Sequence, residues 1–149
     1  MKLVVKRFEE LSVNELYDIM KLRIDIFVVE QNCPYYDLDD LDQDAIHVYI
    51  QEDGIIKAYL RVMDKGVESE YVSIGRVVNR NHGKGYGKRI MDEGIKIAIE
   101  RFNAEKIYLE AQSYAKGFYE RFGFKQISDE FVMDDIPHIK MLLDIKNKI

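Results

Sequence analysis

A glycine-rich turn between a strand-like segment and a helix-like segment constrains this chain more than any other feature. The turn reads His82-Gly83-Lys84-Gly85-Tyr86-Gly87-Lys88-Arg89; it follows the apolar run 71–78 and precedes residues 90–102, whose apolar positions recur at helical spacing. Glycines let the backbone turn sharply and let a ligand approach it closely. The start of a helix presents N–H groups without intrahelical partners and a partial positive charge. The order strand, turn, helix therefore predicts an anion site, most often one for phosphate.

Two common phosphate-binding motifs do not fit this turn. A P-loop needs Ser or Thr after its lysine, but Arg89 follows Lys88. A dinucleotide-binding turn needs a third glycine where this chain has Lys88 or Ile90, depending on the glycine from which the motif is read. A surface turn with solvated lysines is the alternative that the turn by itself leaves open.

Composition argues against several classes of protein. The 149 residues predict a single domain over 1–149, long enough to bury a sizeable core. A net charge of −5 argues against general affinity for nucleic acid or for an anionic membrane. The single cysteine, Cys33, allows no internal disulfide, and neither a signal peptide nor a membrane-spanning apolar stretch is evident. We therefore expect a cytoplasmic protein with no nucleic-acid partner and no membrane partner.

Periodicity and turn signals predict an α/β chain of the α+β kind. Ser12 and Glu15 are spaced as a capping box, so a helix is expected to begin there and to fray at residues 31–34, before a proline. Strands are expected at 3–8, 47–51, 56–63, 70–78, 106–111, 124–132 and 138–145, and further helices at 90–102 and 113–122. This order predicts a single mixed, mostly antiparallel sheet flanked by helices.

The segment 35–44 is the most polar part of the first half and is rich in aspartate. It lacks the glycine and the terminal glutamate of an EF-hand loop, so a solvated acidic loop beside the substrate site is favoured over a metal site. Such a loop would mildly favour a cationic acceptor by attraction across a cleft.

The order of elements resembles that of the GCN5-related N-acetyltransferase (GNAT) family over nearly the whole chain. The pyrophosphate loop of that family reads Arg/Gln-x-x-Gly-x-Gly/Ala; Gly85 and Gly87 fill its glycine positions, and His82 stands where Arg or Gln is usual. Residues 112–124 resemble the family's Asn-x-x-Ala-x-x-x-Tyr-x-x-x-Gly-Phe segment, with Gln112 at the Asn position and Tyr119 at the tyrosine. Within the family the chain is most similar to the ElaA-like branch, through residues 27–35, 75–78, 111–112 and 135–138.

The resemblance implies the GNAT acyl-CoA N-acyltransferase fold and the transfer of an acetyl group from acetyl-CoA, as co-substrate, to a primary amine. The acceptor would be a small molecule or a peptide, its amine would attack the thioester directly, and no metal would be needed. A homodimer is common in the family. A non-catalytic sensor module that binds acyl-CoA is the alternative function. The acidic charge and the lack of a helix-turn-helix pattern disfavour a transcription-associated protein.

The family's motifs place acetyl-CoA against the strand end and the glycine-rich turn. The implied cofactor-binding residues are Val77, Val78, His82, Gly83, Lys84, Gly85, Tyr86, Gly87, Lys88 and Gln112. The backbone N–H of Val77 or Val78 would stabilise the oxyanion of the reaction. Tyr119 matches the tyrosine that protonates the departing thiolate in the family; a core aromatic residue on an amphipathic helix is the alternative.

The base that takes the proton of the amine is left open between Glu110, Glu30 and His138, of which His138 could instead cap the start of a strand. The expected substrate-binding residues are Arg23, Glu30, Cys33, Tyr35 and Arg76. Arg23 and Arg76 could hold a substrate carboxylate or form ion pairs within the protein. Cys33 is expected to be a packed or cavity-lining thiol rather than a nucleophile.

Overall fold

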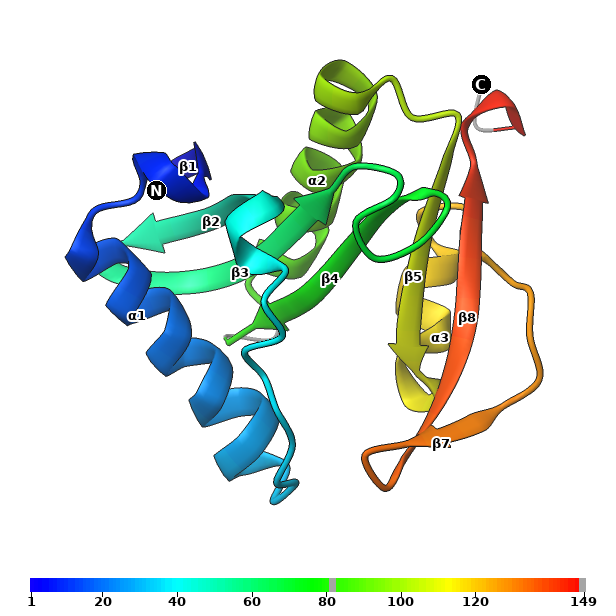
Figure 1. Cartoon of the computed structure of the whole chain (residues 1–149), viewed down its shortest axis with the longest axis horizontal. Coiled ribbons are helices and arrows are strands. Elements are labelled where there is room, and N and C mark those ends of the chain that lie inside the picture. The colour runs from blue at the N-terminus through cyan, green and yellow to red at the C-terminus, as the bar shows by residue number, and fades with distance from the viewer. Residues whose placement is uncertain (81–82, 148–149) are drawn as a thin grey trace.

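One mixed sheet organises the chain (Figure 1), and the computed structural model describes residues 1–80 and 83–147. Within these residues the strand order is β1-β2-β3-β4-β5-β8-β6, and β7 pairs with β8. Neighbouring strands are antiparallel except β4 and β5, which are parallel. The strands are β1 (Lys2–Arg7), β2 (Ala45–Glu52), β3 (Ile55–Met63), β4 (Val72–Asn79), β5 (Lys106–Gln112), β6 (Lys125–Gln126), β7 (Phe131–Met133) and β8 (Ile136–Asp144). The predicted fold class is confirmed.

The described residues form three α-helices that flank the sheet: α1 (Val13–Ile24), α2 (Tyr86–Phe102) and α3 (Lys116–Glu120). The predicted capping box is present at the start of α1, because Ser12 Oγ accepts the Glu15 amide at 3.0 Å and Glu15 Oε1 accepts the Ser12 amide at 2.9 Å. The helix continues as a π-helical turn, Asp25–Glu30, and ends before the proline as predicted. In the described part of the chain no helix is long and apolar enough to cross a membrane.

The helices divide between the two faces of the sheet (Figure 1). On one face, Ile19 and Leu22 of α1 pack with Tyr49 and Tyr59. On the other face, α2 and α3 pack against the residues that alternate with these along the strands. A Cβ added to Gly94 of α2 would lie 2.8 Å from a methyl carbon of Leu60, so the small residue lets helix and sheet approach closely.

The C-terminal third differs from the prediction in two places. The strand expected at 124–132 is divided into β6 and β7, because the hydroxyl of Ser128 accepts the Lys140 amide at 2.9 Å and the chain then leaves the ladder. Strand β8 starts earlier than expected, because Asp134 and Asp135 both adopt left-handed φ values, 53° and 62°, and close a tight hairpin turn. The helix expected at 113–122 is a 3-10 turn followed by the short α3.

Candidate active site

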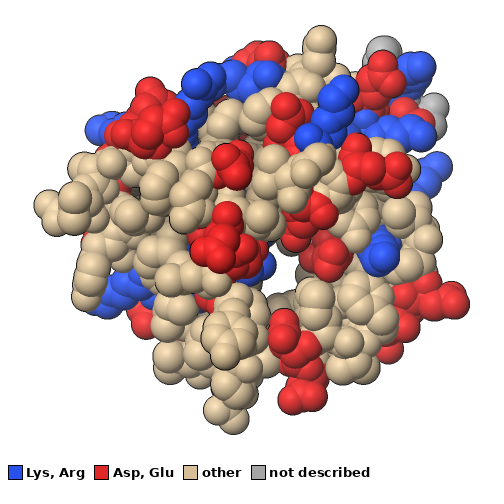
Figure 2. Space-filling view, viewed as in Figure 1, with Lys and Arg blue, Asp and Glu red and all other residues tan. Residues whose placement is uncertain are grey.

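Strands β4 and β5 separate after a short parallel contact, which pairs Val72 with Ile107 and Ser73 with Tyr108. Beyond that contact a cavity of about 870 Å³ fills the gap. Its walls include residues 74–79 of β4, among them Val77 and Val78, together with Leu109, Glu110 and Gln112 of β5. The gap divides the sheet into one half with β1–β4 and another with β5–β8. Figure 2 shows an opening between the two halves, with acidic side chains around it. The separation of the two strands therefore creates a passage through the sheet.

A β-bulge shapes the β4 wall of this cavity. Gly75 pairs with Arg61 and Val78 with Tyr59, so two residues of β4, Arg76 and Val77, lie opposite a single residue of β3. Arg76 has a φ of 53°, in the left-handed region that residues other than glycine seldom adopt. Because a bulge interrupts the hydrogen-bond ladder, main-chain groups of this segment become available to a ligand in the cavity.

The glycine-rich turn leads from the end of β4 into α2. Gly83 and Gly85 have φ values of 83° and 80°, and an added Cβ at either position would meet no atom within 4 Å. The residue at the N-cap position of α2, Gly85, has no side chain that could accept a hydrogen bond. It therefore leaves the first N–H groups of α2 without a side-chain cap. Asn79, which lines the cavity, contacts this turn, because a Cβ added to Gly87 would lie 2.7 Å from Asn79 Nδ2. The cavity and the helix start are therefore adjacent.

The described polar residues of the turn, Lys84, Tyr86 and Lys88, lie beside the cavity rather than in its lining. Lys84 and Lys88 are exposed, and Lys88 Nζ forms an ion pair with Asp92 Oδ2 at 2.9 Å. The hydroxyl of Tyr86 donates to a carboxylate oxygen of Glu52. His82, which stands where the family has Arg or Gln, lies outside the described residues.

Tyr119 lies on α3 and reaches the cavity from the face of the sheet that carries α2. The residue is only 9% exposed, and its ring packs edge-on against Phe118 and Phe124, at centroid distances of 5.1 and 6.2 Å. Burial, reinforced by the nearby Tyr114, raises the pKa of the phenol above its usual value. The hydroxyl is therefore protonated at neutral pH, as a proton donor must be.

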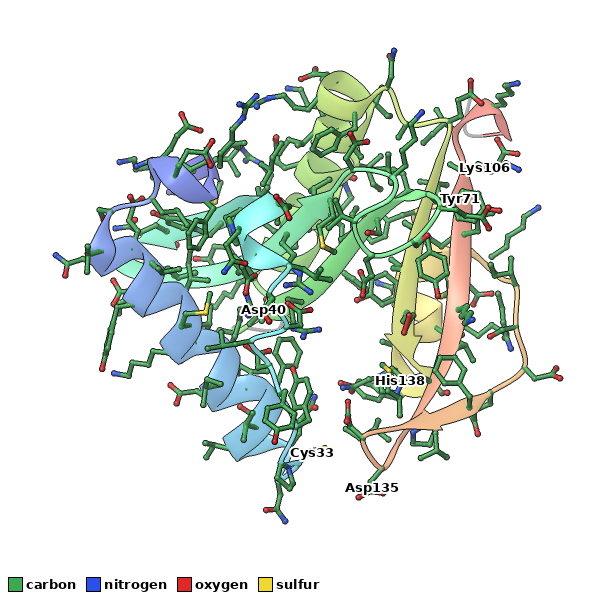
Figure 3. All side chains as sticks on the ribbon, viewed as in Figure 1. Cys33, Asp40, Tyr71, Lys106, Asp135 and His138 are labelled. Carbon is green, nitrogen blue, oxygen red and sulfur yellow. The ribbon has the colours of Figure 1, made fainter. Side chains whose placement is uncertain are left out.

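Glu110, Gln112 and His138 extend from the opposite face of the sheet. Gln112 pairs directly with His138 across β5 and β8, and Glu110 lies two residues back along the same face. His138 Nδ1 lies 2.7 Å from the Ile136 carbonyl, which can only accept, so Nδ1 carries the hydrogen and Nε2 of the neutral ring keeps its lone pair. Glu110 accepts the Tyr108 hydroxyl at 3.1 Å. All three side chains line the cavity, and Figure 3 shows His138 directed into the gap.

Residues 31–36 bridge the two halves of the sheet at one end of the gap. The amides of Gln31 and Gln112 exchange two hydrogen bonds, at 3.0 and 3.3 Å. Cys33 Sγ donates to the Asp134 carbonyl at 2.7 Å, where Figure 3 shows Cys33 across from the β7–β8 turn. Burial and the charges of Asp134 and Asp135 raise the pKa of the thiol. Cys33 is thus a protonated, cavity-lining thiol as expected, and Glu30 and Tyr35 also line the cavity.

Arg23 does not line the cavity, and the prediction that it binds substrate is wrong. Its side chain is fully buried, with Nε 2.9 Å from Asp37 Oδ2 and Nη1 2.6 Å from Asp42 Oδ1. Arg61 of β3, also fully buried, bonds to Asp42 at 2.9 Å and to Asp39. The periodicity of α1 turns Arg23 towards the sheet, where it holds internal carboxylates rather than a ligand.

The aspartate-rich segment 35–44 is correspondingly not a solvated loop. Asp37 and Asp42 are buried, and Asp39 is half-buried against Arg61. Burial opposes ionisation of Asp39, but the hydrogen bonds and charges of Arg61 and the charge of Arg76 outweigh it and lower its pKa to about 2. We call the three aspartates and the three arginines Arg23, Arg61 and Arg76 the ion cluster.

The strand order and the gap between β4 and β5 define the GNAT acyl-CoA N-acyltransferase fold, and the comparisons agree. The chain matches the family described as "Acetyltransferase (GNAT) domain" over residues 25–145, and it belongs to that family. It is 36% identical to the UPF0039 protein C11D3.02c of Schizosaccharomyces pombe, covering 97% of this chain and 98% of that protein. It is also 36% identical to protein ElaA of Escherichia coli, covering 91% and 92% of the two chains.

Two solved structures resemble this one along almost their whole length. A crystal structure of an acyl-CoA N-acyltransferase from Pseudomonas aeruginosa superposes with a TM-score of 0.90 at 36% identity, covering 96% of this chain and 99% of that one. The crystal structure of Escherichia coli ElaA gives a TM-score of 0.89 at 33% identity, with coverage of 96% and 99%. The resemblance to the ElaA-like branch is confirmed.

Sequence reasoning missed two residues that shape the site. Asn79 joins the cavity to the glycine-rich turn, and its Oδ1 is buried without a hydrogen-bond partner in the described part of the chain. Arg61 anchors the ion cluster from the middle of an apolar strand, between Leu60 and Val62. A charged residue at a buried strand position needs a partner of opposite charge. The position of Arg61 between two apolar residues could therefore have predicted a buried ion pair.

Proposed function

We propose that this chain is an acetyl-CoA-dependent N-acetyltransferase that transfers an acetyl group directly to a primary amine. The observation that supports this most is the continuous path from the gap between β4 and β5, past Asn79, to the left-handed Gly85 at the start of α2. The diphosphate of CoA would bind the N–H groups at the start of α2. The pantetheine arm would then run along the gap and bring the thioester to the bulge in β4.

The bulge would supply the electrophilic contact. When an amine attacks the thioester, negative charge grows on the carbonyl oxygen, and a fixed backbone N–H can stabilise that charge. Val77 and Val78 follow the bulged residue and line the cavity, so the N–H of one of them is the proposed donor. A backbone group suits this role because the strand fixes it in place before the reaction begins.

The two faces of the sheet would serve different proton transfers. An alkyl amine has a pKa near ~10.4, so a base must first remove a proton. His138 Nε2 or the Glu110 carboxylate, on the α1 face, would accept that proton from the acceptor. The N–C bond then forms and the C–S bond breaks. Tyr119, on the α2 face, would give its hydroxyl proton to the departing sulfur.

The proton donation by Tyr119 is uphill but within reach of a positioned group. From ordinary pKa values of ~10 for tyrosine and ~8.5 for a thiol, the cost is roughly 2 kcal/mol. Burial raises the pKa of Tyr119 further, which increases the cost. The same burial also raises the pKa of a thiol leaving group in the filled cavity, so the two effects oppose each other.

The acceptor that the cavity favours is a cationic amine. Five carboxylate residues line it, in addition to the ion-cluster residue Asp39, namely Asp25, Glu30, Glu68, Glu110 and Asp134. Burial raises the pKa of Glu68, and the charge of Glu110 adds to that effect although Arg61 opposes it. Two neighbouring carboxylates of like charge attract a cation between them. These residues, rather than the aspartates paired in the ion cluster, now support the preference for a cationic acceptor.

The test is release of free thiol from acetyl-CoA, measured against a panel of alkyl amines, diamines and peptides. Wild-type protein is expected to release CoA with at least one cationic amine. Gly85→Asp places a carboxylate where the diphosphate would lie and is expected to abolish acetyl-CoA binding. Gly66→Asp is the matched control, because Gly66 is likewise left-handed, at a φ of 91°, with nothing within 4 Å of an added Cβ. Micromolar binding by Gly85→Asp contradicts the proposed site, whereas wild-type binding without turnover indicates an acyl-CoA sensor.

A further inference from the structure

The left-handed conformation of Arg76 is an unusual feature of the cavity wall. A residue with a Cβ pays a steric cost at a φ of 53°, so the surrounding structure must impose this conformation. Residues of this kind gather at functional sites because the strain sets a geometry that a relaxed strand would not adopt. Arg76 lies at the bulge, immediately before Val77 and Val78, which line the cavity and one of whose N–H groups is the proposed donor to the thioester.

The side chain of Arg76 is held by the segment that follows Pro34. Its Nη2 donates to the Asp37 carbonyl at 3.0 Å and to Asp39 Oδ2 at 3.3 Å. Its Nε lies 3.0 Å from Asp37 Oδ1, within ion-pair distance although the N–H is not aligned for a hydrogen bond. The guanidinium carbon lies 5.5 Å from the centre of the Tyr35 ring, and the Tyr35 hydroxyl in turn donates to Asp37 at 2.7 Å. Four contacts thus fix the guanidinium.

The residues that hold Arg76 are themselves anchored in the core. Asp37 is buried and bonds to the fully buried Arg23 of α1. Asp39 bonds to the fully buried Arg61 of β3. The position of the Arg76 guanidinium is therefore set by α1 and β3 rather than by solvent. Two of its guanidinium nitrogens, Nε and Nη2, thus lie against Asp37 and Asp39, while the residue also lines the cavity. The role expected from the sequence, that Arg76 holds a substrate carboxylate, stays a prediction.

We propose that Arg76 is a positioning residue whose guanidinium, held by Asp37 and Asp39, keeps residue 76 left-handed and so aims the N–H of Val77 or Val78 at the thioester carbonyl. This inference rests on the proposed function, because it needs a thioester in the gap. In a regular antiparallel strand the same N–H groups would alternate between β3 and the opposite edge. The bulge changes that alternation, and the ion cluster keeps the bulge in place.

The experiment separates the carbonyl contact from the rest of the ligand by comparing acetyl-CoA with CoA. The two ligands share every group except the acetyl, so the ratio of their dissociation constants reports contacts made by the thioester. One net hydrogen bond corresponds to a ratio of roughly 2- to 12-fold. The carbonyl stretching frequency of bound, carbon-13-labelled acetyl-CoA reports the same contact spectroscopically. A residue that only stabilises the fold would move neither quantity selectively.

Two substitutions at one position distinguish conformation from charge. Arg76→Ala removes the guanidinium and leaves a residue that disfavours the left-handed region, so the acetyl-CoA advantage and the carbonyl shift should both be lost while CoA affinity changes by less than about twofold. Arg76→Gly also removes the guanidinium but adopts positive φ without steric cost, so it should keep most of the acetyl-CoA advantage. If Arg76→Ala fails to fold, Arg76→Gln replaces it, because glutamine also lacks the guanidinium and also disfavours the left-handed region.

Each other result counts against the inference. Equal loss of the acetyl-CoA advantage in both variants means that the guanidinium itself contacts the ligand. No loss in Arg76→Ala means that the bulge does not depend on Arg76. If wild-type protein binds no acetyl-CoA at all, the proposed function fails together with this inference, and that result is distinct from both of the others.

Discussion

The ion cluster behind the cavity gives a prediction whose size follows from the structure. The carboxylate of Asp42 bridges two fully buried guanidiniums, at 2.6 Å from Arg23 Nη1 and 2.9 Å from Arg61 Nη1. Burial disfavours the charged form of Asp42, but the hydrogen bonds and charges of the two arginines outweigh it and lower the pKa of the carboxyl. The substitution Asp42→Asn keeps the shape of the side chain, removes its charge and replaces one carboxylate oxygen with an NH2 group.

The Asp42→Asn substitution should lower the free energy of unfolding considerably, because both arginines would remain buried with one counter-charge fewer. Removing one partner of a buried ion pair costs about 3–5 kcal/mol. That is a substantial part of the roughly 5–15 kcal/mol that stabilises an ordinary domain. At about 2–4 °C per kcal/mol for a chain of this size, the melting temperature should fall by roughly 6–20 °C.

The assay is urea unfolding at pH 7 followed by circular dichroism, supported by thermal melts. Asp44→Asn is the matched control, because Asp44 lies in the same 3-10 turn (Asp42–Asp44) but is exposed. It should change the free energy of unfolding by no more than about 0.5 kcal/mol. A loss below about 1 kcal/mol for Asp42→Asn would refute the reasoning, since it would mean that the buried arginines do not depend on this carboxylate.

Three further predictions concern single residues of the same framework. The pKa of Asp39 is lowered from 3.8 to about 2, so its stabilisation is present above about pH 4 and is lost as pH falls towards 2. In urea titrations Asp39→Asn should therefore be less stable than wild type by roughly 2 kcal/mol at pH 6, and the two should converge near pH 2. Gly94→Ala should lower the free energy of unfolding by about 1–3 kcal/mol, because the new methyl overlaps Leu60. Adding Leu60→Val to that variant should recover part of the lost stability. An unchanged free energy of unfolding in Gly94→Ala would show that α2 is not tightly packed there. Tyr119→Phe should lower the rate of thiol release while leaving acetyl-CoA affinity within about twofold of wild type. Unchanged turnover at every pH would mean that Tyr119 is not the acid. Tyr17→Phe, on the exposed side of α1, is the control.

Local signals in the sequence were sufficient for the framework of the site. The capping box at Ser12 needs only four consecutive residues, and both of its hydrogen bonds are present. The left-handed conformations of Gly83 and Gly85 follow from glycine itself, and the segment around Tyr119 has a fixed spacing. Each of these features depends on neighbours in the chain, so the sequence displays it directly.

The ion cluster could not be predicted, because its members are far apart in the chain. Arg23 and Asp37 are separated by 14 residues, and Arg76 and Asp37 by 39. From composition alone a run of aspartates is expected to be solvated, because nothing in the neighbouring sequence indicates which arginines will form ion pairs with it. The left-handed Arg76 was equally hidden, because an arginine in a strand gives no sign that the strand will bulge there.

The most direct test of the whole account is a crystal structure of the protein with acetyl-CoA. We expect the diphosphate at the N–H groups that follow Gly83 and Gly85, and the thioester carbonyl oxygen about 3 Å from the N–H of Val77 or Val78. We also expect the sulfur on the side of the gap that carries Tyr119. Acetyl-CoA bound elsewhere, or a gap between β4 and β5 that stays empty at saturating ligand, would contradict it.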